Sequence, residues 1–173
     1  SYNRQGLRQT AMSSEMLQLT DGNDLPMIGI GAFCMKTEEE TRAVIKKAIS
    51  LGVRHFEISE LFGNGHIIVD AIRQDLERSQ VNITYKIWPK ERGPKELVHN
   101  CIETLKLNKL EYVDLLLLHN PINPTKLNEQ WSGLEYMQTK GLAKSLGVCG
   151  YSETQLMQLL KDCTVQPTVV EME

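Results

Sequence analysis

Three side chains that can hold or transfer a proton lie within or directly after apolar segments of this sequence. Glu57 belongs to segment 53–58, Lys86 to segment 81–87, and His119 follows segment 113–118. Carboxylate, ammonium and imidazole groups act as acids and bases when a fold brings them together. These residues could instead have structural roles. Lys86 and Glu57 could form a buried ion pair, and His119 could be an imidazole satisfied within the core.

The elements that must position these residues alternate between strand and helix patterns. Short apolar runs predict six strands, at 27–30, 53–58, 81–87, 113–118, 143–148 and 168–172. Apolar residues at helical spacing predict five helices, over 37–52, 67–76, 93–105, 131–141 and 152–160. The first and last of these helices begin with capping-box spacing, and Pro94 suits the first turn of the third.

Before the first strand, the segment 16–28 has the pattern of a β-hairpin. Alternating residues on either side flank Asp21-Gly22, a dipeptide that tolerates the positive φ of a tight reversal. Residues 1–14 are polar and without periodicity, and we expect them to form a flexible arm ahead of a single domain over 15–173.

Alternation of strands and helices predicts parallel strands with right-handed crossovers. An open doubly wound sheet and a closed (β/α)₈ barrel both satisfy this pattern. No Gly-x-Gly-x-x-Gly follows the first strand, which weighs against the dinucleotide-binding open sheet. Six βα units match a barrel that lacks its last two strands, since a whole barrel takes about 250 residues.

Composition excludes several classes of function. The formal net charge of −3 and scattered basic residues argue against nucleic-acid binding. No apolar run is long enough to cross a membrane, and no secretory signal is visible, so a cytoplasmic location is expected. The four cysteines lie far apart without metal-ligand spacing, and we expect reduced, mostly buried thiols and no metal site.

Six segments resemble the aldo-keto reductase family in order and spacing, and together they cover nearly the whole chain. They lie at 26–31, 52–57, 84–88, 113–121, 140–152 and 166–173. The second segment carries Arg-His-Phe-Glu and is followed by Leu-Phe-Gly-Asn. The resemblance implies a (β/α)₈ barrel with an N-terminal hairpin, of which this chain contains about six βα units.

The same resemblance implies hydride transfer from NADPH to a carbonyl group. In the family, a Tyr donates the proton with help from a Lys and an Asp, and a His orients the carbonyl. Lys86 and His119 match their counterparts, whereas Glu57 replaces the Asp and Phe62 replaces the Tyr. A phenyl ring has no proton to donate, and the longer Glu57 side chain displaces its carboxylate.

Neither of two nearby phenols is a clear substitute for the missing Tyr. Tyr85 neighbours Lys86 on a strand and should therefore face the helices, while Tyr151 lies past the fifth strand on the nicotinamide side. Trp88 matches its motif, where it could flank the pocket or pack at the barrel rim.

The cofactor positions also depart from the family. The resemblance implies Ser-Asn after the fifth strand as contacts to the nicotinamide carboxamide, and this chain has Cys149-Gly150. It implies Asn-Gln on the sixth strand, where this chain has Val170-Glu171. We therefore expect NADPH binding to be weak or absent, because lost polar contacts cost about 1–3 kcal/mol each.

Two functions remain open from the sequence. The first is a catalytically degenerate aldo-keto-reductase-like domain that acts as a scaffold, regulatory or assembly subunit with a protein partner. An open sheet edge would suit such pairing. The alternative is an active, divergent NADPH-dependent aldehyde or ketone reductase whose proton comes from water or another residue.

Overall fold

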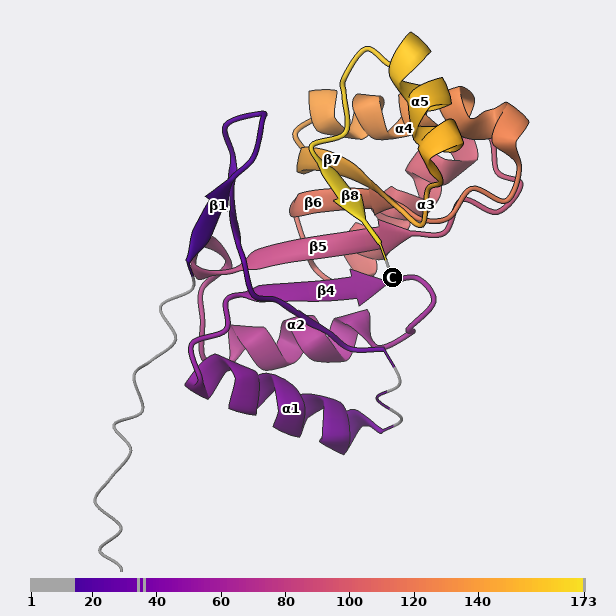
Figure 1. Cartoon of the computed structure of the whole chain (residues 1–173). Helices are drawn as coiled ribbons and strands as arrows, with labels where there is room; N and C mark the ends of the chain where they lie inside the picture. Colours follow the sequence, from indigo (N-terminus) through magenta and orange to yellow (C-terminus); the bar gives the residue numbers. More distant parts are fainter. Residues whose placement is uncertain (1–14, 34, 36, 173) are drawn as a thin grey trace, which may run out of the picture.

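The computed structural model describes residues 15–33, 35 and 37–172 (Figure 1). Its main sheet has six parallel strands that lie side by side in chain order. They are β3 (Ile30–Gly31), β4 (His55–Ser59), β5 (Asn82–Ile87), β6 (Val113–Leu118), β7 (Ala143–Cys149) and β8 (Val169–Glu171). A doubly wound sheet would reverse its strand order at a switch point. The unbroken order confirms the barrel-type architecture.

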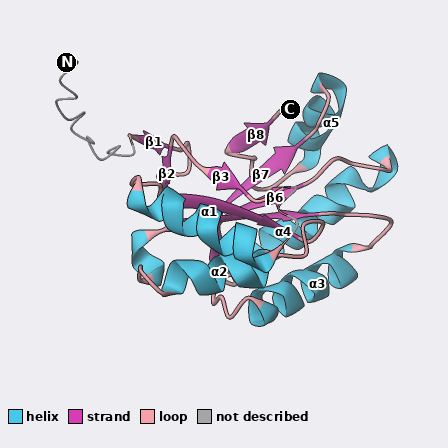
Figure 2. Cartoon of the chain, turned by 90° about the horizontal axis from the view of Figure 1, so that it is seen from below, coloured by secondary structure: helices cyan, strands magenta, loops and turns pink. Residues whose placement is uncertain are grey.

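Helices connect successive strands and lie along one side of the curved sheet (Figure 2). They are α1 (Glu38–Ser50), α2 (Gly65–Arg73), α3 (Pro94–Leu107), α4 (Leu127–Thr139) and α5 (Glu153–Asp162), with short 3₁₀ turns η1 (Arg78–Gln80) and η2 (Pro124–Lys126). The hydrophobic core lies between these helices and the sheet. Strand side chains that face the helices contribute to it, among them Phe56, Ile58 and Leu116.

Local sequence signals set several helix ends as predicted. The Thr37 side chain accepts a hydrogen bond from the Glu40 amide at 3.1 Å at the start of α1. Ser152 and Gln155 form a full capping box at the start of α5. Helix α4 begins four residues earlier than the predicted Trp131, because apolar Leu127 is also buried and extends the helical face.

The N-terminal hairpin consists of β1 (Met16–Gln18) and β2 (Asp24–Pro26), paired antiparallel. Gly22 adopts the positive φ of +86° that the turn requires. Asn23 Nδ2 donates to Ser145 Oγ at 3.1 Å, and Asn82 Nδ2 donates to the Asp24 carbonyl at 3.2 Å. These contacts hold the hairpin against the N-terminal ends of the strands.

The prediction of a buried strand at 27–30 is wrong in its first half. Strand β3 contains only Ile30 and Gly31, and Met27 and Ile28 are exposed at 61% and 47%. The chain crosses His55 on the way, since a Cβ at Gly29 would lie 2.6 Å from His55 Nδ1. Pairing with β4 therefore starts only at Ile30, opposite Phe56.

Three of the four cysteines fall within the described residues. Cys101 and Cys149 are buried free thiols and Cys163 is half-buried, as expected, whereas Cys34 lies outside the described residues. The predicted arm over 1–14 also lies outside them, and the domain boundaries stay a prediction. Within the described part, no helix combines the length and apolar character needed to span a membrane.

Candidate active site

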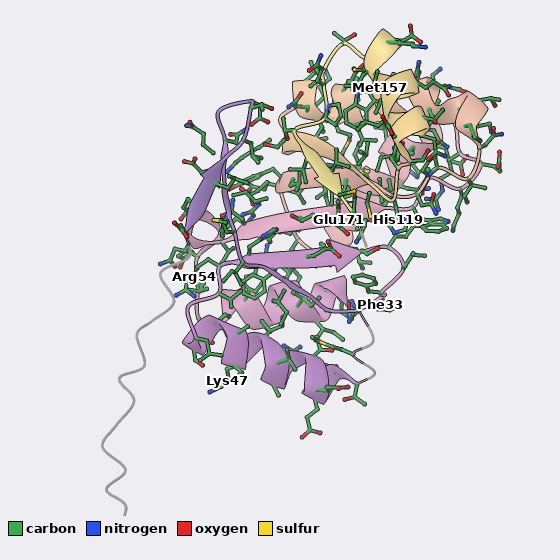
Figure 3. All side chains as sticks on the ribbon, viewed as in Figure 1. Phe33, Lys47, Arg54, His119, Met157 and Glu171 are labelled. Carbon is green, nitrogen blue, oxygen red and sulfur yellow. The ribbon has the colours of Figure 1, made fainter. Side chains whose placement is uncertain are left out.

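The strand register brings the predicted site residues to one end of the sheet. Alternation along each strand directs Glu57 of β4 and Lys86 of β5 to the inner face. In β8, Glu171 pairs with Cys149 of β7, and this pair lies on the same inner face. Figure 3 shows Glu171 and His119 together at the C-terminal end of the strands, where barrel enzymes place their chemistry.

Glu57, Lys86 and Glu171 form an ionic cluster that we call the mouth triad. Lys86 Nζ lies 3.1 Å from Glu57 Oε1, as the ion-pair interpretation predicts, and also contacts Glu171 Oε1. The Lys86 side chain is 8% exposed, against 19% for Glu57 and 30% for Glu171. Two carboxylates thus face one ammonium group, and the triad carries an excess negative charge when all three groups are ionised.

This imbalance appears in the pKa values of the triad. Burial, followed by the charge of Glu171, raises the pKa of Glu57 despite its pairing with Lys86. Burial alone would raise the pKa of Glu171 too, but the hydrogen bond and charge of Lys86, together with hydrogen bonds from Cys149 and Glu57, outweigh burial and lower that pKa. Burial opposes the charge on Lys86, yet the two carboxylates together raise its pKa. Lys86 is therefore a firmly held cation.

The nicotinamide positions of the resemblance are engaged within the chain. Cys149 Sγ donates to Glu171 Oε1 at 3.3 Å, and burial raises the pKa of this thiol to about 12. Gly150 has a φ of +69° and no side chain, and its amide donates to the Glu171 carbonyl at 3.0 Å. A carboxamide needs donors as well as acceptors. In this chain the Cys149 thiol and the Gly150 amide donate to Glu171 instead.

His119 follows β6 and is anchored to the neighbouring strand end. Its backbone amide donates to the Ile87 carbonyl at 2.9 Å. Its ring lies against Trp88, with centroids 4.7 Å apart and planes tilted by 38°. The Trp88 motif position therefore lies beside the imidazole at the sheet's C-terminal end.

Phe62 lies on the loop after β4 and contacts another aromatic ring. The ring centroids of Phe62 and Phe33 are 5.4 Å apart, and Phe33 is 71% exposed. Both rings are purely apolar, so this corner of the barrel mouth offers surface for packing and no hydroxyl proton.

The two candidate substitute phenols point away from the mouth. Tyr85 Oη donates to Thr104 Oγ1 of α3 at 3.2 Å, which confirms that its side chain faces the helices. Tyr151 is 7% exposed and packs within the hydrophobic core. Burial raises the pKa of both hydroxyl groups, which makes them poorer acids.

Sequence reasoning missed a second ion pair at the same end of the sheet. Arg92, on the loop after β5, donates to both oxygens of Glu60, on the loop after β4, at 2.7 and 2.9 Å. The hydrogen bond from Arg92 lowers the pKa of Glu60. The signal available in the sequence was the placement of Glu60 and Arg92 just after consecutive strands.

Comparison with known proteins agrees with this fold and register. The family model described as "Aldo/keto reductase family" matches residues 27–173. The chain is 30% identical over 188 residues to aldo-keto reductase family 1 member A1 of Rattus norvegicus, and 30% identical over 161 residues to methylglyoxal reductase DkgA of Escherichia coli O157:H7. This chain belongs to the aldo-keto reductase family.

Solved structures give the same result. An aldo/keto reductase from Brucella melitensis superposes with a TM-score of 0.85 at 27% identity, over 93% of this chain and 63% of the other. The Bombyx mori aldo-keto reductase in complex with NADP gives 0.82 at 27% identity, over 92% of this chain and 58% of the other. The alignments to the rat and E. coli relatives cover 94% and 91% of this chain but only 57% of each relative.

Proposed function

We propose that this chain is a catalytically degenerate aldo-keto reductase domain that serves as a scaffold, regulatory or assembly subunit. The observation that carries the proposal is Phe62, at the position where the family resemblance implies the proton-donating Tyr. Its ring packs on Phe33 and offers no hydroxyl group. Loss of a positioned general acid costs about 10²–10⁴ in rate.

The charge of the mouth supports the same proposal. Carbonyl reduction develops negative charge on the substrate oxygen, which a free cation nearby would stabilise. Here Lys86 contacts both Glu57 and Glu171, so two carboxylates compensate its charge. An oxyanion at this place would meet an excess of negative charge.

The two edge strands of the sheet support a role in binding a protein partner. Among the described residues, β3 pairs only with β4 and β8 only with β7. An unpaired strand edge presents N–H and C=O groups to another strand. These edges can accept strands from a protein partner or from the remainder of a longer polypeptide.

Binding and turnover assays test the proposal directly. Titration of the protein with NADPH, followed by fluorescence or calorimetry, should show no binding tighter than micromolar. NADPH oxidation with a simple aldehyde should not exceed the rate without protein, and the protein should copurify in an assembly with a second polypeptide. Reductase turnover by the chain alone would overturn the proposal.

One observation favours the alternative, an active divergent reductase. Glu57 is 3.1 Å from Lys86, is partly open to the mouth, and has a raised pKa. A carboxyl group that keeps its proton can act as a general acid. If Glu57 has this role, turnover should fall as the pH rises through its pKa, and Glu57→Gln should abolish turnover that the native protein shows.

A further inference from the structure

A groove lies between α3 and α4, which are neighbours on the outer side of the sheet (Figure 2). It has a volume of about 470 Å³ and is open to solvent. Sites for small molecules typically have volumes of roughly 300–1,000 Å³ and are lined by apolar side chains with a few polar groups. We call this space the α3–α4 groove. Its lining residues are Pro94, Lys95, Val98, Ser132, Gly133 and Tyr136.

Gly133 brings the two helices together at the floor of this groove. The residue is buried within α4, and a Cβ built on it would lie 3.2 Å from the Pro94 carbonyl oxygen and 3.5 Å from Leu97 Cδ2. Glycine is unfavourable inside a helix compared with alanine, and here it permits a close approach to the α3 backbone. The floor of the groove is therefore backbone, and no side chain of α4 fills it at this point.

The walls of the groove offer apolar surface on both sides. Pro94 and Val98 of α3 are half-buried. Tyr136 of α4 is 49% exposed, and Lys140 Nζ lies 5.4 Å from the centre of its ring. This cation–π contact helps to hold the ring in place. An aromatic or alkyl body can therefore pack between the two helices.

Two polar groups of the groove are donors without partners. The Lys95 side chain is exposed and takes part in no ion pair or hydrogen bond among the described residues. The Tyr136 hydroxyl also has no hydrogen-bond partner in the described part of the chain. Ser132 Oγ, in contrast, donates to the Glu129 carbonyl at 2.7 Å, so this hydroxyl lies along its own helix. An ammonium and a phenol together favour an acceptor that carries negative charge.

The charges around the groove also favour an anion. Lys95 is the one charged residue among those that line it. The acidic residues nearby in the chain are directed elsewhere. Glu96 pairs with the loop after β5, and Glu135 accepts from backbone amides of the loop after α5. Glu129 directs Oε1 toward the start of α3. None of these three acids lines the groove, so a carboxylate placed there meets a cation and no second carboxylate.

We propose that the α3–α4 groove binds a small amphipathic carboxylate. Its aromatic or alkyl body packs against Val98 and Tyr136, and its carboxylate accepts from Lys95. This site is independent of the proposed loss of reductase chemistry, because its lining residues all come from α3 and α4 and none belongs to the mouth triad.

Three probes with the same phenylbutyl skeleton test the proposal by NMR. Titration with 4-phenylbutyrate should shift the backbone amide signals of Val98, Ser132 and Gly133 and saturate with a dissociation constant on the order of 1 mM. The neutral 4-phenylbutanol should bind about threefold more weakly, because it cannot form the ion pair. The cationic 4-phenylbutylamine should bind at least about tenfold more weakly, because Lys95 repels it.

Two variants and a control locate the binding. Lys95→Gln should weaken the binding of phenylbutyrate about threefold and leave that of phenylbutanol unchanged. Lys46→Gln makes the same change of charge at an exposed position of α1 and should alter neither. Tyr136→Ala removes the aromatic wall and should weaken both probes about fivefold. All three positions are exposed, so the variants should stay folded, which urea denaturation checks.

Several results would overturn the proposal. The first is the absence of any shift at phenylbutyrate concentrations well above the expected dissociation constant. The second is equal binding of phenylbutylamine and phenylbutyrate, which would show that charge does not select the ligand. The third is a change of the groove signals with protein concentration alone that Tyr136→Ala removes. In that case the groove is an interface between copies of this chain.

Discussion

Buried charges at the two ends of the sheet have opposite balance. At the N-terminal end, one carboxylate lies between two cations, and we call this group the base cluster. Asp114 accepts from Arg78 Nη2 at 2.6 Å, from Lys144 Nζ at 2.8 Å and from the Ile83 amide at 2.9 Å. At the C-terminal end, the mouth triad places one ammonium between two carboxylates.

The two clusters differ in where the excess charge lies. In the base cluster, Asp114 is 6% exposed, while the side chains of Arg78 and Lys144 are 22% and 47% exposed and both lie over the Tyr112 ring. The surplus positive charge therefore reaches water. In the mouth triad, the surplus is a half-buried carboxylate whose pKa is raised. The base cluster therefore stabilises the fold, whereas the mouth triad retains an unfavourable negative charge.

The largest effect is expected from breaking the base cluster. Asp114→Ala leaves two cations and the Ile83 amide without their acceptor. We expect a loss of about 3 kcal/mol in the free energy of unfolding, the low end for a broken buried pair, because both cations can hydrate. Urea denaturation measures it. Asp114→Asn keeps an oxygen that can accept from the Ile83 amide, so its loss in the free energy of unfolding should be smaller. Equal losses for the two variants would show that the charge of Asp114 does not contribute.

A smaller loss is expected from the equivalent change at the mouth. Lys86→Met leaves Glu57 and Glu171 facing each other without a cation, and should cost about 2 kcal/mol near pH 8. Near pH 4 a carboxyl group takes up a proton and relieves the repulsion, so the loss should shrink. Denaturation at both pH values tests this contrast, and a loss that does not depend on pH would contradict it.

Neutralising the surplus carboxylate should stabilise the protein. The folded-state pKa of Glu57 is raised, so its contribution to stability is present at low pH and is lost as the pH rises through that pKa. Glu57→Gln should therefore increase the free energy of unfolding by about 1 kcal/mol near pH 7. This gain in the free energy of unfolding should vanish below about pH 4, because Glu57 is then protonated in both the folded and the unfolded protein.

Glu171→Gln is the matched control for this change. The pKa of Glu171 is lowered, so its contribution is present above the ordinary range for Glu and is lost as the pH falls through the folded-state pKa. This substitution should therefore destabilise the protein near pH 7. Thermal unfolding measures the change in stability of each variant. Changes of the same sign for both variants would refute the assignment of the excess charge to Glu57.

The smallest effect is expected where the family chemistry is restored at one atom. Phe62→Tyr supplies the missing phenol, but the mouth triad and the Cys149, Gly150 and Glu171 positions stay unchanged. Because residues of a site act as a unit, we expect no measurable NADPH oxidation with a simple aldehyde, and none from Phe62→Tyr combined with Glu57→Asp. A rate increase of about 10²–10⁴ would show that only the acid is missing.

Much of the fold could be predicted from periodicity. The run Val113–Leu118 is a strand with both faces buried, at the bounds that its apolar residues indicate. Capping residues set the starts of α1 and α5 for local reasons that a sequence carries. The prediction of a buried strand at Met27 and Ile28 was wrong because apolar composition alone cannot distinguish an exposed segment from a buried strand.

The site was partly predictable for a related reason. Strand-end placement and alternation predict that Lys86 and Glu57 meet, and they do at 3.1 Å. The second partner of Lys86 could not be inferred, because Glu171 comes from a strand three positions away and only the curl of the sheet brings it across. The roles of these residues in catalysis stay predictions.

The hairpin contact between Asn23 and Ser145 has a consequence for the order of folding. The two residues are separated by 122 positions, whereas neighbouring strands and helices pair over short stretches. Contacts between distant residues form only after the loop-closure entropy is overcome. The βα units can assemble one after another, and the hairpin can already contact Asn82 of β5, but its contact with Ser145 cannot form until β7 is in place. Closure of the sheet's N-terminal end is therefore a late step in folding.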